Sequence, residues 1–399
     1  MVFIDQCFAN CILMNITILS KVAKLSFVFI LILLGIFSLQ NCSAELTTYR
    51  QAEISYNATW LAMFCDFRFP ARGDEYLTEY FKTKNSVRHM AIDINHPDTL
   101  IYVDGHALKS TDRRTVSLIA GSENDYGFLN GKGGSARFWY ITSFVQLSSR
   151  HIVAVDRQNH CLRLIDSLSG DVSTFSGDCQ HVGFIDGQQG KYRQPYSIIK
   201  DNQDADMLLI SDDGNSAIRE YDTRLKYVGT FYQNKANLLF KPKVITQQSK
   251  TGDIFMTTSS HVIFRLSYER HVLTRLAGSI EGDSDGSFST ARFRFPSAIL
   301  LLDEGRQLVV ADEPQGRLRI LGMRTLMTRS VCSKTNGRAL GQWDKCGFDN
   351  PYCLLVNGSD LLIGDFGRIT KIRGEATTLF VSNQFLLVLL VVTNCLLLV

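Results

Sequence analysis

Aspartate and arginine recur at a fixed spacing along this 399-residue chain, and both are residue types found in catalytic and ligand-binding sites. An aspartate ends several apolar runs, as in IVAVD and LVVAD, and an arginine follows seven positions later. The aspartates are Asp104, Asp156, Asp212, Asp312 and Asp365, with Thr258 in the equivalent place; the arginines are Arg163, Arg219, Arg265 and Arg319. A ring of carboxylates could bind a cation, but a catalytic group need not recur in every copy. We therefore interpret the aspartates as turn residues that accept backbone N–H bonds, and the arginines as their ion-pair partners or as solvent-facing residues.

Other motifs with chemical meaning are few. The segment 282–286, GDSDG, carries two carboxylates but lacks the later glutamate of a calcium loop, so we interpret it as a tight turn. The sequence has no nucleophile elbow, no P-loop and no H-E-x-x-H motif. We predict no cofactor and no metal site from these patterns.

These aspartates and arginines belong to a longer sequence unit that repeats along the chain. The segment from Val116 reads VSLIAGSENDYGFLNG, then SARFWYITSFVQL, then HIVAVDRQNHCLRLID, and similar segments start at Val172 and Leu273. Weaker copies lie near Val228 and Thr328, and a truncated copy precedes Val116. The spacing runs from about 40 to 56 residues, which is typical of propeller blades and too long for most leucine-rich or ankyrin units.

Each copy contains short β-branched and aromatic runs separated by Gly, Asp and Asn, which predicts four strands per copy. The innermost strands are predicted to begin near Val87, Ile141, Tyr196, Lys243, Ser297 and Tyr352. The last copy supplies only three strands. We expect the segment 45–82, which contains LTEYFKT, to supply the fourth and close the ring.

The repeated unit resembles the NHL family, over roughly Tyr76 to Gly374. The triplet that names the family corresponds to Asn159, His160 and Cys161 in one copy and to Asn215, Ser216 and Ala217 in another. The resemblance implies an all-β fold, a six-bladed β-propeller of NHL repeats, and by itself it implies no activity. Some similar propellers are lyases whose metal is held by histidines of the central channel. Only His89 falls at the start of an innermost strand here, so we interpret it as a polar group at the channel mouth.

The two ends predict export and a membrane tether. Residues 1–44 have the basic, apolar and small-residue regions of a signal peptide, with an uncleaved anchor as the alternative. The predicted propeller occupies residues 45–374, and an apolar tail fills 375–399. Gly374 and Ala376 are candidate attachment sites for a GPI anchor, whereas a span from Leu379 to Val399 would instead form a transmembrane segment.

Six cysteines remain between these ends, and an even set in an exported chain favours disulfides. Six cysteines allow fifteen connectivities. From their places in the repeat we predict Cys161–Cys179, Cys332–Cys346 and Cys65–Cys353. Asn57 and Asn357 lie in glycosylation sequons.

Long glycine-rich loops join one predicted blade to the next, and they should gather on one face of the ring. Such loops on a rigid scaffold are where binding is usually found. The aromatic residues in or beside them are Tyr126, Phe128, Trp139, Tyr140 and Phe184. Aromatic residues suit partner binding, but these side chains could equally pack neighbouring blades together.

We therefore predict a non-enzymatic module at the cell surface, on the extracellular side of the plasma membrane. Its partner would be an extracellular protein or glycan. The alternative is a metal-dependent lyase or hydrolase with its site in the central channel. The predicted signal peptide, the cysteines and a net charge of only +3 argue against nucleic acid as a partner.

Overall fold

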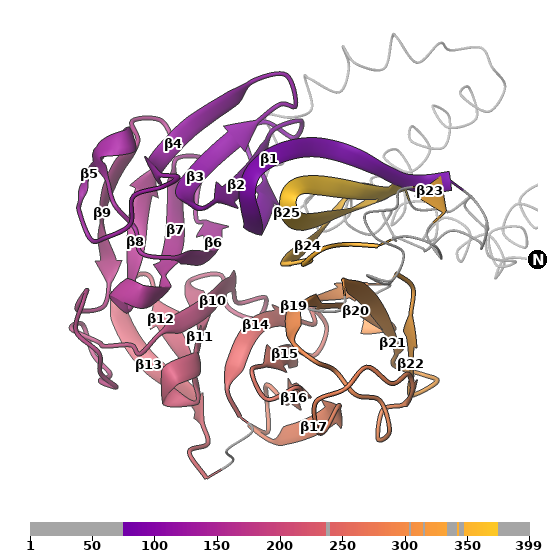
Figure 1. Cartoon of the computed structure of the whole chain (residues 1–399). Coiled ribbons are helices and arrows are strands. Elements are labelled where there is room, and N and C mark those ends of the chain that lie inside the picture. The colour runs from indigo at the N-terminus through magenta and orange to yellow at the C-terminus, as the bar shows by residue number, and fades with distance from the viewer. Residues whose placement is uncertain are drawn as a thin grey trace, which may run out of the picture. The chain divides into compact units, whose positions relative to one another are not determined.

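A computed structural model describes residues 75–236, 240–302, 305–313, 316–332, 341–342 and 347–373. These residues form antiparallel β-sheets and three single-turn 3₁₀ helices, η2 (Gly133–Ser135), η3 (Arg157–Asn159) and η4 (Asp213–Asn215). The sheets are arranged around a common centre as a β-propeller (Figure 1). The leader, Asn57, Cys65, Cys346 and the tail that contains Gly374 and Ala376 lie outside the described residues.

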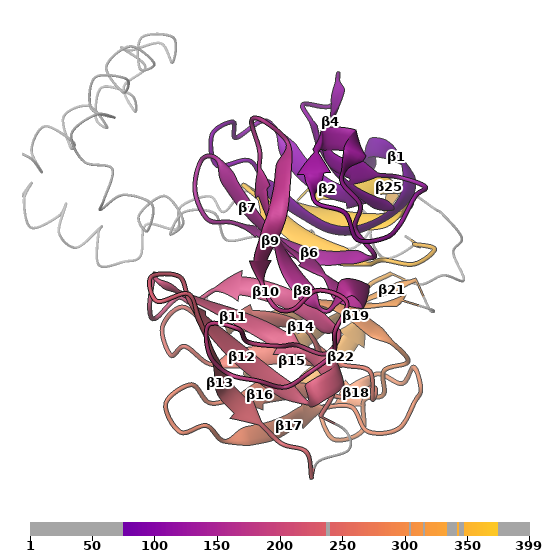
Figure 2. The ribbon, with the colours of Figure 1, turned by 90° about the vertical axis from the view of Figure 1, so that its left-hand side faces the viewer.

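Four of the sheets each come from one continuous stretch of chain. The second sheet holds β6 (Ile141–Gln146), β7 (His151–Asp156), β8 (Cys161–Asp166), β9 (Asp171–Ser176) and β5 (Gly131–Lys132). The third holds β10 (Pro195–Lys200), β11 (Met207–Asp212), β12 (Ala217–Asp222) and β13 (Tyr227–Gln233), which follow one another across the sheet (Figure 2). The fourth holds β14 (Pro242–Gln247), β15 (Ile254–Thr258), β16 (Ile263–Leu266) and β17 (Leu273–Ala277). The fifth holds β19 (Pro296–Leu302), β20 (Gln307–Asp312), β21 (Arg317–Gly322), β22 (Met327–Ser330) and β18 (Gly286–Ser287).

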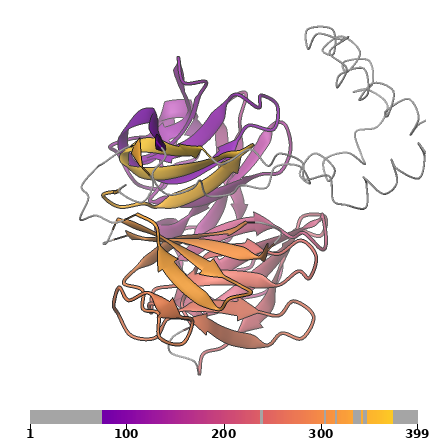
Figure 3. The same cartoon turned by 90° about the vertical axis from the view of Figure 1, so that its right-hand side faces the viewer.

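The remaining sheet joins the two ends of the described chain. It is seven-stranded and contains β24 (Cys353–Asn357), β25 (Asp360–Arg373), β1 (Glu75–Ile92), β2 (Leu100–Asp104), β3 (His106–Thr111) and β4 (Val116–Ser122), with β23 (Gly341–Gln342) beside β1. Figure 3 shows the yellow C-terminal strands beside the indigo N-terminal ones.

The strand β1 is long because it changes partner along its length. Residues Leu77 to Ser86 pair with β25, and Val87 to Ile92 pair with β2, with register shifts between. Five hydrogen-bonded sheets are therefore counted among the described residues, where the sequence predicted six blades. The difference arises because a continuous β1 merges the first and last groups of strands into one sheet.

The innermost strands are β1, β6, β10, β14, β19 and β24, and each contacts the next in a closed ring. The hydrophobic core lies between neighbouring sheets. One cluster packs Val103 and Leu108 of the first sheet against Phe144 and Ile152 of the second, all nearly inaccessible to solvent. Because a sheet buries both faces only between two neighbours, closing the ring covers every face.

Glycine is required where an outer strand ends and the chain turns toward the next sheet. Gly121 and Gly278 have φ angles of 92° and 86°. A Cβ there would lie 2.4 Å from the carbonyl oxygens of His106 and His261, respectively. No other residue type fits this approach, so these two glycines fix where the interblade loops begin.

Candidate functional site

Three of the recurring Asp–Arg pairs are buried ion pairs. The distance from the arginine Nη1 to the aspartate Oδ2 is 2.8 Å in Asp156–Arg163 and 3.3 Å in Asp212–Arg219. It is 3.5 Å in Asp312–Arg319, and all six side chains are fully buried. The structure thus selects ion pairing over solvent exposure for these arginines.

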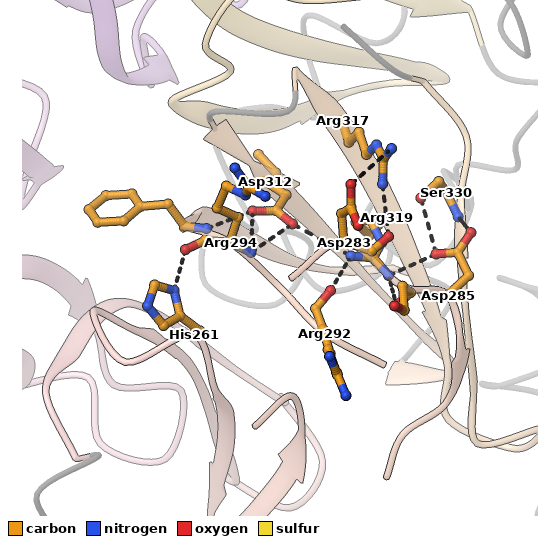
Figure 4. Close-up of polar contacts among 12 residues, drawn as sticks. His261, Asp283, Asp285, Arg292, Arg294, Asp312, Arg317, Arg319 and Ser330 are labelled. Atoms are coloured by element: carbon orange, nitrogen blue, oxygen red, sulfur yellow. Dashed lines mark hydrogen bonds and ion pairs between the residues drawn. The ribbon is translucent and has the colours of Figure 1, made fainter. Parts of the chain in front are cut away.

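Each of the three arginines also donates hydrogen bonds to two backbone carbonyls and to one Asp or Asn side chain of the preceding loop. In the fifth sheet, Arg319 donates to the carbonyls of Arg292 and Ser284 and to the Asp285 carboxylate (Figure 4). Arg163 and Arg219 repeat this pattern with Asn130 and Asp186, respectively. A buried charge is tolerated only when it is paired and hydrogen-bonded, and every copy meets that condition.

The acidic segment 282–286 takes part in one of these networks. Asp285 accepts from Arg319 and from the Ser330 hydroxyl and backbone N–H, and Asp283 pairs with Arg317 at 3.6 Å (Figure 4). Both carboxylates are therefore engaged by protein donors. This agrees with the interpretation of the segment as a structural turn.

The fourth sheet shows what happens without the aspartate. Thr258 stands in its place, and its hydroxyl donates to the Val262 carbonyl at 2.7 Å. Arg265 then turns outward, where its side chain is 48% exposed, and pairs with Asp253 instead. The inward arginine therefore depends on the carboxylate beneath it.

Two of the predicted binding aromatics cover these arginines. The Phe128 ring lies 4.7 Å from the Arg163 guanidinium carbon, and the Phe184 ring lies 4.6 Å from that of Arg219. Both rings are half-buried. Phe128 and Phe184 thus pack against the buried guanidinium groups, which agrees with the packing alternative of the sequence analysis. Their part in a binding face stays a prediction.

The aspartates also position the residues that precede the next inner strand. Asp156 accepts the Trp139 backbone N–H at 2.7 Å, and Asp212 accepts that of Arg193 at 2.8 Å. Burial raises the pKa of Asp212 to about 6, against the opposing effects of its hydrogen bonds and of Arg219. These two carboxylates therefore act as positioning residues for Trp139 and Arg193.

Histidines connect adjacent sheets at equivalent turns, a role that the sequence analysis missed. The Nδ1 of His106 accepts the Tyr140 N–H at 3.3 Å, and that of His160 accepts the Gln194 N–H at 3.2 Å. Burial lowers the pKa of both imidazoles, which favours the neutral acceptor form. His261 bonds through Nδ1 to the Arg294 carbonyl (Figure 4). The histidine of the N-H-L triplet was the available signal.

Tyr126 and Trp139 form an exposed aromatic pair. Their ring centroids are 5.5 Å apart and stacked, and the side chains are 62% and 43% exposed. His106 packs against Tyr126 with centroids 5.7 Å apart. Tyr140, the fifth aromatic residue predicted for this face, instead lies 3.8 Å from the Arg88 guanidinium carbon and is half-buried.

A pocket of about 480 Å³ adjoins this pair, between the second and third sheets. Its lining is mostly polar and includes Trp139, Gln158, His160, Gln180, Arg193 and Gln194. The amides and the guanidinium offer both donors and acceptors beside an aromatic ring. Such a mixture can fix the orientation of a polar ligand.

A disulfide secures one wall of the pocket. Cys161 and Cys179 are bonded as the sequence predicted. They directly flank two lining residues, because His160 precedes Cys161 and Gln180 follows Cys179. The Gln180 N–H also donates to the Asn159 carbonyl at 2.7 Å. The disulfide therefore holds the segment that contains Gln180 next to His160 and the start of β8.

The other cysteines give a mixed outcome. Cys332 is disulfide-bonded, and its predicted partner Cys346 lies outside the described residues. Cys353 carries a free thiol, so the predicted Cys65–Cys353 bond is wrong. The thiol is buried on β24 and donates to the Val87 carbonyl at 3.2 Å, and burial raises its pKa well above the usual range. Cys353 thus behaves as a small core residue.

Two further residues from the sequence analysis, Asn357 and His89, lie on β24 and β1 of the seven-stranded sheet. Asn357 is half-buried at the turn between β24 and β25. No group of three or more metal-ligating side chains occurs in the described ranges, and His89, whose pKa burial lowers to about 4, packs against Phe144. None of the described elements is a helix of sufficient length and apolarity to cross a membrane.

Comparison with known proteins shows the fold alone. No family model matches the sequence, and no curated protein is significantly similar to it. An auxiliary nutrient binding protein from Bacteroides ovatus is 15% identical with a TM-score of 0.58, and the match covers 78% of this chain and 76% of that one. Virginiamycin B lyase from Staphylococcus aureus is 9% identical with a TM-score of 0.46, covering 71% and 79%. A chain of the nidogen–laminin complex is 12% identical with a TM-score of 0.45, covering 67% and 85%.

Proposed function

We propose that this protein is a non-enzymatic binding module of the NHL type that takes an extracellular protein or glycan. The observation that carries the proposal is the exposed Tyr126–Trp139 stack beside a polar pocket of about 480 Å³. Large exposed aromatic pairs are unusual on a surface without a partner, and aromatic residues are enriched where partners bind. The fold relative from Bacteroides ovatus is also a binding protein by its description.

The polar pocket favours a glycan over a protein within this proposal. Gln158, Gln180, Gln194 and Arg193 line it, and their side chains can exchange hydrogen bonds with hydroxyl groups. The Trp139 ring provides an apolar surface next to them. A saccharide needs both features, because its hydroxyls must be satisfied while its C–H faces are covered.

A glycan array with the intact protein tests this proposal. Wild-type protein should bind a restricted set of glycans, and Trp139→Ala and Gln194→Ala should each weaken that binding at least tenfold. Leu168→Ala is the matched control, because Leu168 is 79% exposed in the turn between β8 and β9, outside the pocket lining. Equal loss in the control, or unchanged binding by Trp139→Ala, would contradict the assignment of the site.

We further propose six blades, with β1 shared between the first and the last. The support is the ring of six inner strands and the partner change of β1 at Val87. Deleting residues 75–82 should then destabilise the last blade first. Hydrogen exchange would show β25 losing protection before β10 to β13, whereas uniform loss would argue against a separate last blade.

Cell-surface attachment is proposed on the apolar tail at 375–399, and the Cys161–Cys179 disulfide fits an oxidising compartment. Phosphatidylinositol-specific phospholipase treatment of intact cells separates the two kinds of tether. Release into the medium supports a GPI anchor at Gly374 or Ala376. Retention supports a transmembrane segment from Leu379 to Val399.

A further inference from the structure

Two cationic side chains lie at equivalent places on opposite sides of the ring centre. Arg88 lies on β1 and Lys243 on β14, and each directly follows the residue that opens the pairing with the next strand, Val87 or Pro242. In the ring order β1, β6, β10, β14, β19 and β24, two strands separate β1 from β14 in either direction. The two cations are therefore related by about half a turn around the ring.

The aromatic residues around Arg88 and those around Lys243 are also at equivalent places, about half a turn apart around the ring. Each cation faces one ring at the start of the next inner strand and one at the start of the preceding inner strand. The ring centroids lie at 3.8 Å (Tyr140) and 5.8 Å (Tyr352) from the Arg88 guanidinium carbon, and at 3.6 Å (Phe295) and 5.4 Å (Tyr196) from the Lys243 Nζ. Such a repeated arrangement reflects a built environment for positive charge.

Neither cation has an acceptor in the described part of the chain. No hydrogen bond or ion pair joins the Arg88 guanidinium to another described residue, and its Nε is buried. The Nε atoms of Arg163 and Arg319 are likewise unpaired, but the Nη atoms of those two arginines have carboxylate and carbonyl acceptors. The Lys243 side chain contacts rings, and the residue is only 6% exposed. Aromatic faces offset only part of the cost of removing a cation from water, and burial accordingly lowers the pKa of Lys243 to about 8.

The charges nearby leave a positive excess. Arg157 pairs with Asp213 at 3.2 Å and is thereby neutralised. Glu313 is half-buried and makes no ion pair with Arg88 or Lys243 among the described contacts, although their charges act to lower its pKa against the effect of burial. Two unpaired cations and one carboxylate leave a single positive charge at the ring centre.

We propose that the ring centre is a binding site for a small organic carboxylate, held between Arg88 and Lys243. A monoanion matches the excess of one positive charge. The planar guanidinium fork of Arg88 fits the two oxygens of a carboxylate, and Lys243 supplies a point charge. The surrounding tyrosines and Phe295 provide an apolar lining for the body of the ligand. This site is separate from the glycan pocket and does not depend on it.

Benzoate is a suitable probe, and benzamide is its neutral isostere. Titration of the full-length protein, followed by calorimetry and by thermal unfolding, should show saturable benzoate binding and a rising Tm. Benzamide should produce neither effect. Arg88→Gln and Lys243→Gln should each reduce benzoate affinity at least tenfold. Lys241→Gln is the matched control, since Lys241 lies on the same segment but donates to the Ser216 hydroxyl at 3.1 Å.

Three outcomes would overturn the proposal. They are the absence of benzoate binding by folded wild-type protein, equal binding of benzamide, and unchanged affinity in both variants. Near-ultraviolet circular dichroism establishes that each variant is folded. Lys243→Met, which keeps the apolar contacts with the rings, replaces Lys243→Gln if that protein does not fold. Loss of benzoate binding with intact glycan binding separates this site from the proposed glycan pocket.

Discussion

Two groups of cationic side chains in this protein have opposite surroundings. Arg163, Arg219 and Arg319 lie within the sheets, and each has a carboxylate beneath it and carbonyl oxygens around it. Arg88 and Lys243 lie at the ring centre, where they face aromatic rings and no acceptor in the described part of the chain. In the first arrangement the protein supplies an acceptor for both Nη atoms of each arginine. In the second arrangement no described residue supplies such an acceptor, so the two groups differ in whether the protein alone neutralises the positive charge.

Breaking a complete network should give the largest effect. Asp156→Ala leaves Arg163 buried without its carboxylate, and we expect the free energy of unfolding to fall by about 3–5 kcal/mol. Urea denaturation followed by tryptophan fluorescence would measure it. Arg224→Met, in the turn between β12 and β13, is the control, because Arg224 and its partner Asp206 are 66% and 43% exposed and this ion pair should contribute under about 1 kcal/mol. Similar losses in both variants would erase the distinction between buried and exposed pairs.

Removing the Cys161–Cys179 disulfide should have the next largest effect. The double variant Cys161→Ala/Cys179→Ala releases a loop with a sequence separation of 18, which corresponds to about 3 kcal/mol in the chain-entropy model. Because His160 and Gln180 flank the bond, glycan binding should weaken as well. Denaturation and array measurements on the same preparation would test both. Loss of stability with unchanged binding would show that the disulfide does not shape the pocket.

Lys243→Met tests whether the charge at the ring centre lacks a partner within the protein. Without an anion, removing an unpaired buried charge should leave the free energy of unfolding within about 1 kcal/mol of wild type or raise it. Saturating benzoate should then reverse the order, because only wild type gains binding energy. Thermal unfolding with and without benzoate would measure the change. A strong loss of stability in anion-free buffer would mean that Lys243 already has a partner.

The last expected effect, a pH dependence from His89 next to Arg88, is absent at neutral pH and develops only on acidification. Burial lowers its folded-state pKa to about 4 from an ordinary value near 6.5. The unfolded chain therefore takes up the proton first, and stability should decline as pH falls from about 6.5 toward 4. The groups facing His89 include Phe144. His89→Gln should flatten this part of the stability profile measured by urea titration, and an unchanged slope would assign it to other groups, such as His106 and His160.

Local patterns in the sequence were sufficient for much of the fold. The inner strands begin within about one residue of the predicted positions at Ile141, Tyr196, Lys243 and Ser297, because β-branched runs and turn residues are local signals. The pairing of Cys161 with Cys179 was also accessible, since both belong to one repeat. The contacts of Phe128 and Phe184 with buried arginines could not be predicted in this way. The local sequence around a loop aromatic residue is the same whether its ring faces solvent or a buried guanidinium.

From the amino-acid sequence alone, the chain is predicted to form repeated four-stranded units with an aspartate at one turn and an arginine seven residues later. That information is local, because hydrophobic alternation and turn chemistry act within a few residues. The tertiary structure added that Cys353 is a free core thiol, that one continuous strand, β1, pairs with both the first and the last groups of strands, and that Arg88 and Lys243 lie about half a turn apart around the ring. These features depend on contacts between residues more than 100 positions apart in the sequence. Such contacts form only when the ring closes, so no local sequence pattern predicts them.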